Sequence, residues 1–225
     1  MVAFYSALSG EGQLSTDCPR LQIDDAVVER TLRGLGLWRG AYVVFAPGAE
    51  FGPAKRWPAA HFAELAAQLD VRVVLLGSAK DAALCRQIEE PVNAAMPGRC
   101  LNLAGLTSLT QALSVIGGSR QMVSNDSGLM HVAAALGGPQ VAIFGSSSPL
   151  HTPPLSTAAV VLWLKQDLLY QPPLDCAPCF QRECPLGPNE GHLRCLTDIS
   201  AARVHDAMRR ASAAPAALRP SAVPQ

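Results

Sequence analysis

"QMVSNDSGLMHVAAALGGPQVAIFG" (residues 121–145) joins two short apolar runs through a helical pattern. The runs, 121–124 and 140–145, have the length of strands and lack polar alternation, which is typical of strands covered on both faces. Between them, 127–138 predicts a helix with four side chains on its core face: Leu129, Val132, Ala133 and Leu136. A strand, a helix and a strand in this order indicate a right-handed crossover between parallel strands.

The rest of the chain repeats this alternation. Further apolar runs of strand length are 42–46, 71–77 and 159–164. Further helical patterns cover 24–38, 58–69, 80–96 and 108–119. Together they predict an α/β fold with a doubly wound, Rossmann-like parallel sheet. Ligands of such sheets bind at the carboxyl ends of the strands, so the loops that follow the strands are the candidate site.

The composition predicts a soluble globular protein. The chain has 225 residues, of which 49% are hydrophobic, and its formal net charge is zero. A neutral chain has no general attraction to nucleic acid, so we expect no nucleic-acid partner. The N-terminus lacks the pattern of a signal peptide, and no apolar run reaches the roughly 18 residues of a membrane span. We therefore expect a cytoplasmic protein.

The patterns divide the chain into three segments. Residues 1–40 read as a linker segment with a connecting helix. Residues 41–210 read as one α/β domain that includes a cysteine-rich loop, 175–195. Residues 211–225 are rich in Ala and Pro and predict a disordered tail.

The loop "PGAEFGPAKRWP" (47–58) follows the apolar run 42–46 and gathers basic residues at its end. Glycines such as Gly48 let successive backbone N–H groups form a concave anion site. Lys55 supplies a compact positive charge that suits phosphate, and Trp57 is expected to pin the loop to the following helix. An ordinary strand-to-helix connection with solvated basic residues explains the same pattern, and both interpretations stay open here.

The start of the helix predicted at 127–138 is a second candidate anion site. Asp126 or Ser127 is expected to cap this helix, while free N–H groups and the helix dipole attract an anion. Gly128 lets a phosphate approach the backbone. A carboxylate repels a diphosphate, so Asp126 is expected to hold the turn or a ribose hydroxyl. His131 lies one turn beyond Ser127 and could point at the ligand, although a lone helical histidine is more often structural.

Other loops follow the same pattern. Residues 145–156 and 77–81 also follow strands, and in the latter Asp81 either caps the next helix or contacts a ribose. Several such loops at one sheet edge predict a site for a nucleotide diphosphate. The chain has neither G-x-G-x-x-G nor G-x-x-x-x-G-K-[ST], which argues against a standard dinucleotide fold and a P-loop.

Five motifs in this order resemble the C-terminal, donor-binding half of the ADP-heptose:lipopolysaccharide heptosyltransferases, glycosyltransferase family 9. The motifs are "PGAEFGPAKRWP", "LLGSAKD", "NLAGLTSL", "SNDSGLMHVAAALGGPQVAIFGSSSP" and "TPPLS". The resemblance implies a GT-B-type enzyme that transfers heptose from ADP-heptose to the lipopolysaccharide inner core with inversion. It implies at most peripheral association with the inner membrane. It also implies that Lys55 contacts the diphosphate, with Asp126, Ser127, Gly128 and His131 close by.

The resemblance also implies that the acceptor site and the catalytic base belong to an N-terminal domain that this chain is expected to lack. We therefore expect no catalytic residue here, weak binding of ADP or ADP-heptose, and no transfer by the chain unaided. Two alternatives stay open: a nucleotide-binding module without catalysis, and a transferase that uses another nucleotide sugar.

Four of the seven cysteines form a C-x2-C-x4-C-x10-C pattern: Cys176, Cys179, Cys184 and Cys195. The spacing suits a structural zinc site that stabilises a loop with few apolar residues. Free thiols are an equally good interpretation, and no cofactor is expected for the chemistry itself. A zinc-stabilised interaction module would rest on these cysteines alone.

Overall fold

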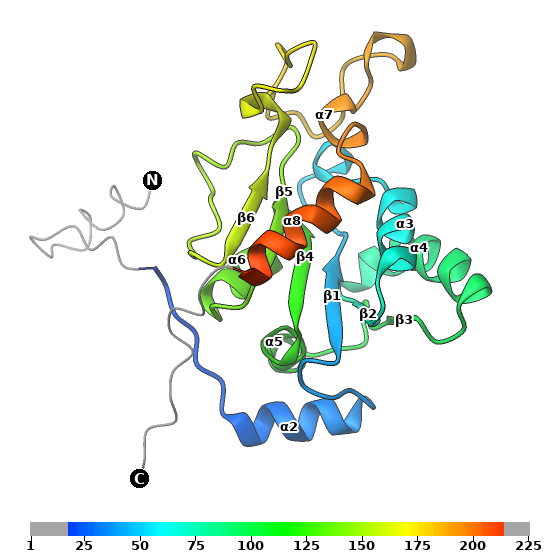
Figure 1. Ribbon diagram of the computed structural model, residues 1–225, viewed down its shortest axis with the longest axis vertical. Coiled ribbons are helices and arrows are strands. Elements are labelled where there is room, and N and C mark those ends of the chain that lie inside the picture. Colours follow the sequence, from blue (N-terminus) through cyan, green and yellow to red (C-terminus); the bar gives the residue numbers. More distant parts are fainter. Residues whose placement is uncertain (1–17, 214–225) are drawn as a thin grey trace, which may run out of the picture.

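Six short strands form one parallel sheet in the computed structural model, which describes residues 18–213 (Figure 1). The strands are β1 (Tyr42–Ala46), β2 (Arg72–Leu75), β3 (Cys100–Asn102), β4 (Gln121–Asn125), β5 (Gln140–Ile143) and β6 (Ala159–Leu162). Five of them fall within the predicted apolar runs or overlap them closely. β3 was not predicted, since three residues are too short to show a pattern.

The strand order is β3-β2-β1-β4-β5-β6, and every neighbouring pair is parallel. After β1 the chain adds β2 and then β3 on one side of β1. It then crosses to the other side of β1, where it adds β4, β5 and β6. This is the doubly wound order of a Rossmann-like fold, and the order reverses between β1 and β4. The predicted fold class is confirmed, and the reversal marks the place where such folds bind ligands.

Helices cover both faces of the sheet (Figure 1). One face carries α2 (Asp25–Gly34), α5 (Leu109–Gly118) and α6 (Gly128–Ala135). The other carries α3 (Ala59–Gln68), α4 (Ala82–Ala95) and α8 (Ala201–Ala213). The short helix α7 (Arg194–Thr197) and the 3-10 turns η1 (Pro53–Lys55), η2 (Ala79–Asp81), η3 (Leu164–Gln166) and η4 (Pro188–Glu190) lie in the connections.

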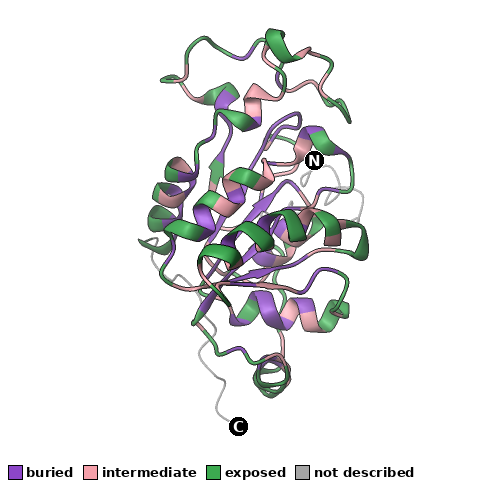
Figure 2. Ribbon diagram, turned by 90° about the vertical axis from the view of Figure 1, so that its right-hand side faces the viewer, coloured by how far each residue is buried: buried purple, intermediate pink, exposed green. Residues whose placement is uncertain are grey.

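The central strand β1 shows why the sheet needs two helical layers. All five of its residues are buried. Val43 and Phe45 pack in the core under α3, α4 and α8, whereas Tyr42, Val44 and Ala46 pack in the core under α2 and α5. Alternate side chains of a strand point to opposite faces, so a strand apolar throughout needs cover on both sides. Figure 2 shows buried strands, in purple, between helices whose outer faces are exposed.

Local sequence sets the helix boundaries. Ser108 accepts a hydrogen bond from the N–H of Gln111, whose side chain accepts one from the N–H of Ser108, so a capping box begins α5. The helix predicted at 24–38 ends earlier, at Gly34, and Gly36 with φ 64° lies just beyond it. Val28 and Leu32 pack this helix onto the main core, so it is part of the domain.

The C-terminal boundary needs a correction. Residues 211–213, assigned to a disordered tail, complete α8, where Ala211 is buried against the sheet. The rest of that tail and the first 17 residues of the predicted linker lie outside the described residues.

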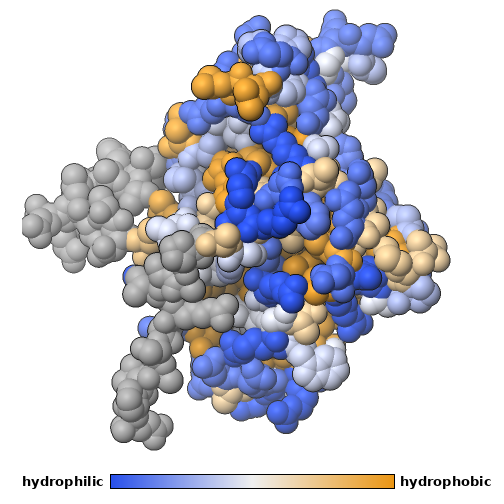
Figure 3. All heavy atoms as spheres, viewed as in Figure 1, coloured by the Kyte–Doolittle hydropathy of each residue, from blue (hydrophilic) through white to orange (hydrophobic). Residues whose placement is uncertain are grey.

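The face of the molecule in Figure 3 is largely hydrophilic. No helix in residues 18–213 is long and apolar enough to cross a membrane.

Candidate functional site

A cavity of about 460 Å³ opens at the carboxyl edge of the sheet. Its walls come from the loops after β1, β2, β3 and β4 and from the start of α6. It lies beside the reversal of strand order between β1 and β4. The sequence placed the site at this edge, and the structure has a cavity there large enough for a nucleoside.

Asp81 forms one wall of the cavity, wedged between two glycines. A Cβ added to Gly48 would lie 2.5 Å from Asp81 Oδ1, and one added to Gly77 would lie 2.8 Å from Asp81 Cβ. Asp81 Oδ2 accepts hydrogen bonds from the N–H and hydroxyl of Ser78, at 2.9 and 2.8 Å. These bonds form a capping box that begins η2, with Ser78 as its N-cap. Asp81 is also the N-cap of α4, but its side chain makes no capping hydrogen bond there, so the predicted side-chain cap of the following helix is not formed. Gly48 serves this close contact, since its φ is not in the left-handed region.

The start of α6 forms another wall. Ser127 is the N-cap, but its side chain makes no capping hydrogen bond, and its buried hydroxyl has no partner among the described residues. The first N–H groups of an α-helix have no partner within the helix. A Cβ added to Gly128 would meet nothing within 4 Å. This helix start therefore leaves donors and space for an anion.

A buried ion pair connects the loop after β1 with the loop after β4. Lys55 Nζ lies 2.5 Å from Asp126 Oδ2, and the two side chains are 18% and 6% exposed. Thr152 donates to the other carboxylate oxygen, Oδ1, at 3.4 Å. Lys55 also lies over the ring of Phe51, 5.2 Å from its centroid. Asp126 therefore orients Lys55 and connects its own loop to those of Lys55 and Thr152. Ser127, and not Asp126, is the N-cap of α6. The contact of Asp126 with a ribose hydroxyl stays a prediction.

Asn125 holds the same two loops together. This fully buried side chain accepts a hydrogen bond from the N–H of Trp57 at 3.0 Å and donates one to the carbonyl of Pro47 at 2.7 Å. Each of these loop groups would otherwise be a buried polar group without a partner. Asn125 thus fixes both ends of the loop that carries Lys55.

Replacing Asn125 with Ala should lower the free energy of unfolding by about 2–3 kcal/mol, because it leaves a buried N–H and a buried carbonyl without hydrogen-bond partners. Denaturant unfolding followed by circular dichroism measures this change. The exposed Asn189 provides the matched control, and its Ala variant should unfold like the parent protein. Equal stability of the two variants would contradict this role for Asn125.

Three other polar side chains of these elements do not line the cavity. Arg56 donates to the carbonyl of Ala49 within its own loop. Lys80 pairs with Glu50, and both side chains are largely exposed. His131 is exposed and does not line the cavity. Residues advance by about 100° around a helix, so the turn that points Leu129 and Val132 at the cavity points His131 away. Its proposed closeness to the ligand stays a prediction.

Several cavity residues escaped the sequence analysis. The apolar side chains Leu129 and Val132 were assigned to the core, yet they line the cavity. Leu109 lines it too and is 69% exposed, which is unusual for a large apolar side chain at the start of a helix. The signal is an apolar residue near the start of a helix that follows a strand: Leu109 and Leu129 lie in the first turn, and Val132 lies one turn after Leu129. Such a position lies at the ligand-binding edge as well as on the core side.

The four cysteines of the predicted zinc site lie together at one end of the molecule. They line a small cavity of about 20 Å³. Burial raises the pKa of the Cys195 thiol to about 12, and the neighbouring Cys176 and Cys184 contribute to this rise. As the side chains stand in residues 18–213, no three His, Cys, Asp or Glu groups are arranged to hold a metal ion.

These features define a class of protein. A doubly wound sheet has a nucleoside-sized cavity at its reversal point, flanked by a helix start and a buried lysine. This is the architecture of domains that bind nucleotides.

Comparison with known proteins then gives the family. Residues 7–189 match the model of glycosyltransferase family 9 (heptosyltransferase). The chain belongs to this family.

Named relatives agree with this assignment. Lipopolysaccharide heptosyltransferase 2 of Escherichia coli K12 is 49% identical over 150 residues, which cover 65% of this chain and 43% of that protein. The Salmonella typhimurium protein of the same name is 55% identical over 123 residues, 53% of this chain and 35% of that protein. The chain therefore spans about half the length of these relatives, or less.

A solved structure extends the match. The structure of E. coli ADP-heptose LPS heptosyltransferase II superposes with a TM-score of 0.70 and 41% identity. The match covers 86% of this chain and 53% of that one. The fold of this chain is therefore the fold of one half of a GT-B heptosyltransferase.

Proposed function

We propose that this chain is the donor-binding part of a lipopolysaccharide heptosyltransferase of type II, and that it binds ADP-heptose at the carboxyl edge of its sheet. The observation that carries the proposal is the buried Lys55–Asp126 pair beside the open N-terminus of α6. The names of the relatives given above supply ADP-heptose as the donor and lipopolysaccharide as the acceptor. The enzyme would act at the cytoplasmic face of the inner membrane, with the lipopolysaccharide inner core as acceptor.

The diphosphate belongs next to Lys55 and the start of α6. An ammonium group has three N–H donors, and Asp126 takes one of them. The remaining donors of Lys55, the first N–H groups of α6 and the unpartnered hydroxyl of Ser127 suit phosphate oxygens. Gly128 leaves room for a phosphate against the backbone.

The adenosine fits the neighbouring cavity. Its volume of about 460 Å³ and the apolar side chains of Leu129 and Val132 suit a flat base. Asp81 Oδ1 faces Gly48, while Oδ2 is bonded to Ser78. We assign Oδ1 to a ribose hydroxyl.

In the proposed heptose transfer, these residues must stabilise the leaving group. In an inverting transfer the acceptor oxygen attacks the anomeric carbon of heptose, and the bond from that carbon to the β-phosphate oxygen breaks. ADP departs with the bonding electron pair, and the hydroxyl proton passes to a base. Lys55 and the α6 N–H groups meet the charge that develops on ADP. Asp126 and Asp81 already accept bonds from Lys55 and Ser78, so we assign neither as the base.

Calorimetric titration tests this proposal and its two alternatives. ADP-heptose should bind more tightly than ADP, because a transferase must also hold the sugar. Equal affinities would favour a nucleotide-binding module, and equally tight binding of UDP-glucose would favour another nucleotide sugar. For the isolated 225-residue chain we expect binding without turnover, and release of ADP in the presence of acceptor would overturn that expectation.

Replacing Gly128 with Ala should weaken ADP binding about tenfold while leaving the protein as stable as before. The added methyl group meets no protein atom within 4 Å, and Ala is a better helix former than Gly by about 1 kcal/mol. A loss of affinity would therefore come from the ligand side. Gly34, which ends α2 and also has open space around it, provides the control variant Gly34→Ala. Unchanged ADP affinity in Gly128→Ala would show that no phosphate approaches this backbone.

A further inference from the structure

The cysteine-rich segment 175–195 has an ordered fold with almost no core of its own. Ala177 is its one buried residue, and the others are exposed or half-buried. Figure 2 shows this mostly exposed segment projecting at one end of the molecule. A segment that buries so little apolar surface needs another source of stability to offset the conformational entropy that it loses.

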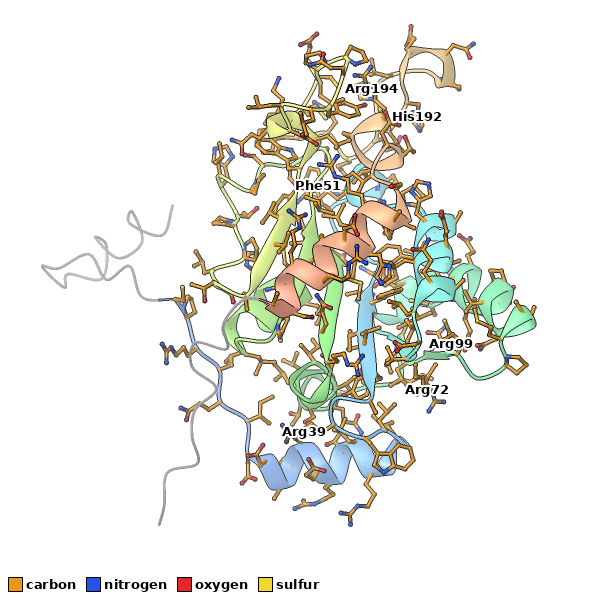
Figure 4. All side chains as sticks on the ribbon, viewed as in Figure 1. Arg39, Phe51, Arg72, Arg99, His192 and Arg194 are labelled. Atoms are coloured by element: carbon orange, nitrogen blue, oxygen red, sulfur yellow. The ribbon has the colours of Figure 1, made fainter. Side chains whose placement is uncertain are left out.

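The four cysteines line one small cavity, although their side chains are not arranged to hold a metal as they stand. Cys176, Cys179, Cys184 and Cys195 all line the cavity of about 20 Å³, which is the space of a single water molecule or ion. Its lining includes no carboxylate and one cation, the side chain of Arg194. Figure 4 shows Arg194 and His192 in this end of the molecule, beyond Phe51. Four thiols around one ion-sized space, with a cation beside them, form a donor set for a thiophilic metal.

One backbone N–H near these cysteines is directed at a sulfur atom of the set. The N–H of Leu193 donates to Cys184 Sγ at 3.3 Å, and N–H groups directed at sulfur are the usual outer support of a metal-bound thiolate. Phe180 and Leu193 have φ values of 53° and 55°, and they are the non-glycine residues with positive φ in residues 18–213. Both lie within two residues of a cysteine of the set. Such conformations persist when their surroundings fix them.

We propose that these four cysteines bind one Zn²⁺ ion as a tetrahedral thiolate site and thereby brace the loop that carries Lys55. The side chains are not arranged to coordinate as they stand, so binding requires them to turn into the cavity that they already line. Four thiolates and Zn²⁺ carry a net charge of −2, which Arg194 partly offsets. Zinc has no redox role here, and each coordinating thiol releases its proton to solvent.

The residues between Cys179 and Cys184 contact the loop that carries Lys55. The carbonyl of Arg182 accepts a hydrogen bond from the N–H of Ala54, in the turn η1 that contains Lys55, at 3.0 Å. A Cβ added to Gly52 would lie 2.4 Å from that same carbonyl oxygen, so the two backbones are in close contact. A metal that fixes the two flanking cysteines also fixes this carbonyl.

A second connection runs through the loop after β5. The N–H of Phe180 donates to the carbonyl of Ser146 at 2.8 Å, and the N–H of Ser146 donates to the carbonyl of Ala54 at 3.3 Å. The side chains of Arg182 and Lys55 both lie over the ring of Phe51, at 5.5 and 5.2 Å from its centroid. The cysteine segment therefore contacts the lysine loop through its backbone and through a shared aromatic ring.

Metal analysis tests the site directly and does not depend on ADP binding. Protein purified without chelators should contain about one zinc per chain by plasma mass spectrometry. Cys184→Ser should lose that zinc. Cys18→Ser should keep it, because Cys18 is exposed and distant in sequence from the four cysteines. Cobalt substituted for zinc should show a thiolate charge-transfer band that Cys184→Ser lacks. Metal-free protein, iron in place of zinc, or zinc retained in Cys184→Ser would overturn the proposal.

Limited proteolysis tests the brace separately. Removal of the metal with a chelator should make trypsin cleave after Arg182 and Arg194 at least about tenfold faster, since the segment opens when its cross-link is lost. Re-addition of Zn²⁺ should restore protection. Cleavage at an unchanged rate in demonstrably zinc-free protein would show that the metal does not hold the segment. Neither readout changes if the proposed donor is wrong.

Discussion

The variant Trp57→Ala is expected to lose about 3–5 kcal/mol of folding free energy, the loss typical of truncating a buried tryptophan. Trp57 is fully buried and packs edge-on against Phe62 of α3, with ring centroids 4.7 Å apart. Its indole N–H donates to the carbonyl of Ile199 at 2.7 Å. The sequence predicted that Trp57 would pin its loop to the next helix, and the contact with Phe62 confirms this.

The cost is large because Trp57 joins three parts of the fold. Its side chain links α3 to the segment before α8, and its backbone N–H donates to the side chain of Asn125. Truncation to Ala therefore leaves a cavity and also leaves the carbonyl of Ile199 without its hydrogen-bond donor. Since the loop that carries Lys55 ends at Trp57, the variant should also lose ADP affinity.

Guanidinium unfolding measures the effect, with Trp38→Ala as control. Trp38 is 72% exposed, and its replacement should change the unfolding free energy by no more than about 0.5 kcal/mol. Trp57→Phe should fall between the two, because it keeps part of the packing and loses the hydrogen bond to Ile199. A Trp57→Ala variant as stable as Trp38→Ala would contradict the structure around this residue.

The second large effect is expected from Lys55→Ala, which should weaken ADP binding about ten- to a hundredfold. Hydrogen bonds to charged groups contribute about 1.5–3 kcal/mol each, and tenfold in affinity corresponds to about 1.4 kcal/mol. The same change leaves Asp126, 6% exposed, without its cation. A loss of stability on the order of 3 kcal/mol should accompany it, since breaking a buried pair leaves a buried charge.

Two further variants separate binding from folding. Lys80→Ala removes the lysine of an exposed ion pair with Glu50 at the rim of the same edge, and exposed pairs contribute at most about 1 kcal/mol. It should keep most of the ADP affinity. Asp126→Asn keeps the shape of the partner and removes its charge, which should disorder Lys55 and weaken ADP binding less than Lys55→Ala. ADP affinity unchanged in folded Lys55→Ala would reduce the ion pair to a structural role.

The sequence was sufficient where the physical signal is local. Apolar runs of at least four residues predicted five strands, and the helical spacing of apolar residues predicted α2 to α6. It was insufficient where the signal is a contact between distant segments. Lys55 and Asp126 are 71 positions apart, and no local rule pairs a lysine with one carboxylate over another. α8 was not predicted, although its buried residues Val204, Ala207, Met208 and Ala211 follow a helical spacing that the sequence contains.

The central claim is that the diphosphate of a donor nucleotide lies between Lys55 and the start of α6. A crystal structure of the protein grown with ADP tests it most directly. The account predicts the β-phosphate within hydrogen-bonding distance of Lys55 Nζ and the N–H groups at Ser127 and Gly128, with the adenosine in the cavity beside Asp81. ADP bound elsewhere on the molecule, or in this cavity with its phosphates turned away from Lys55, would contradict it.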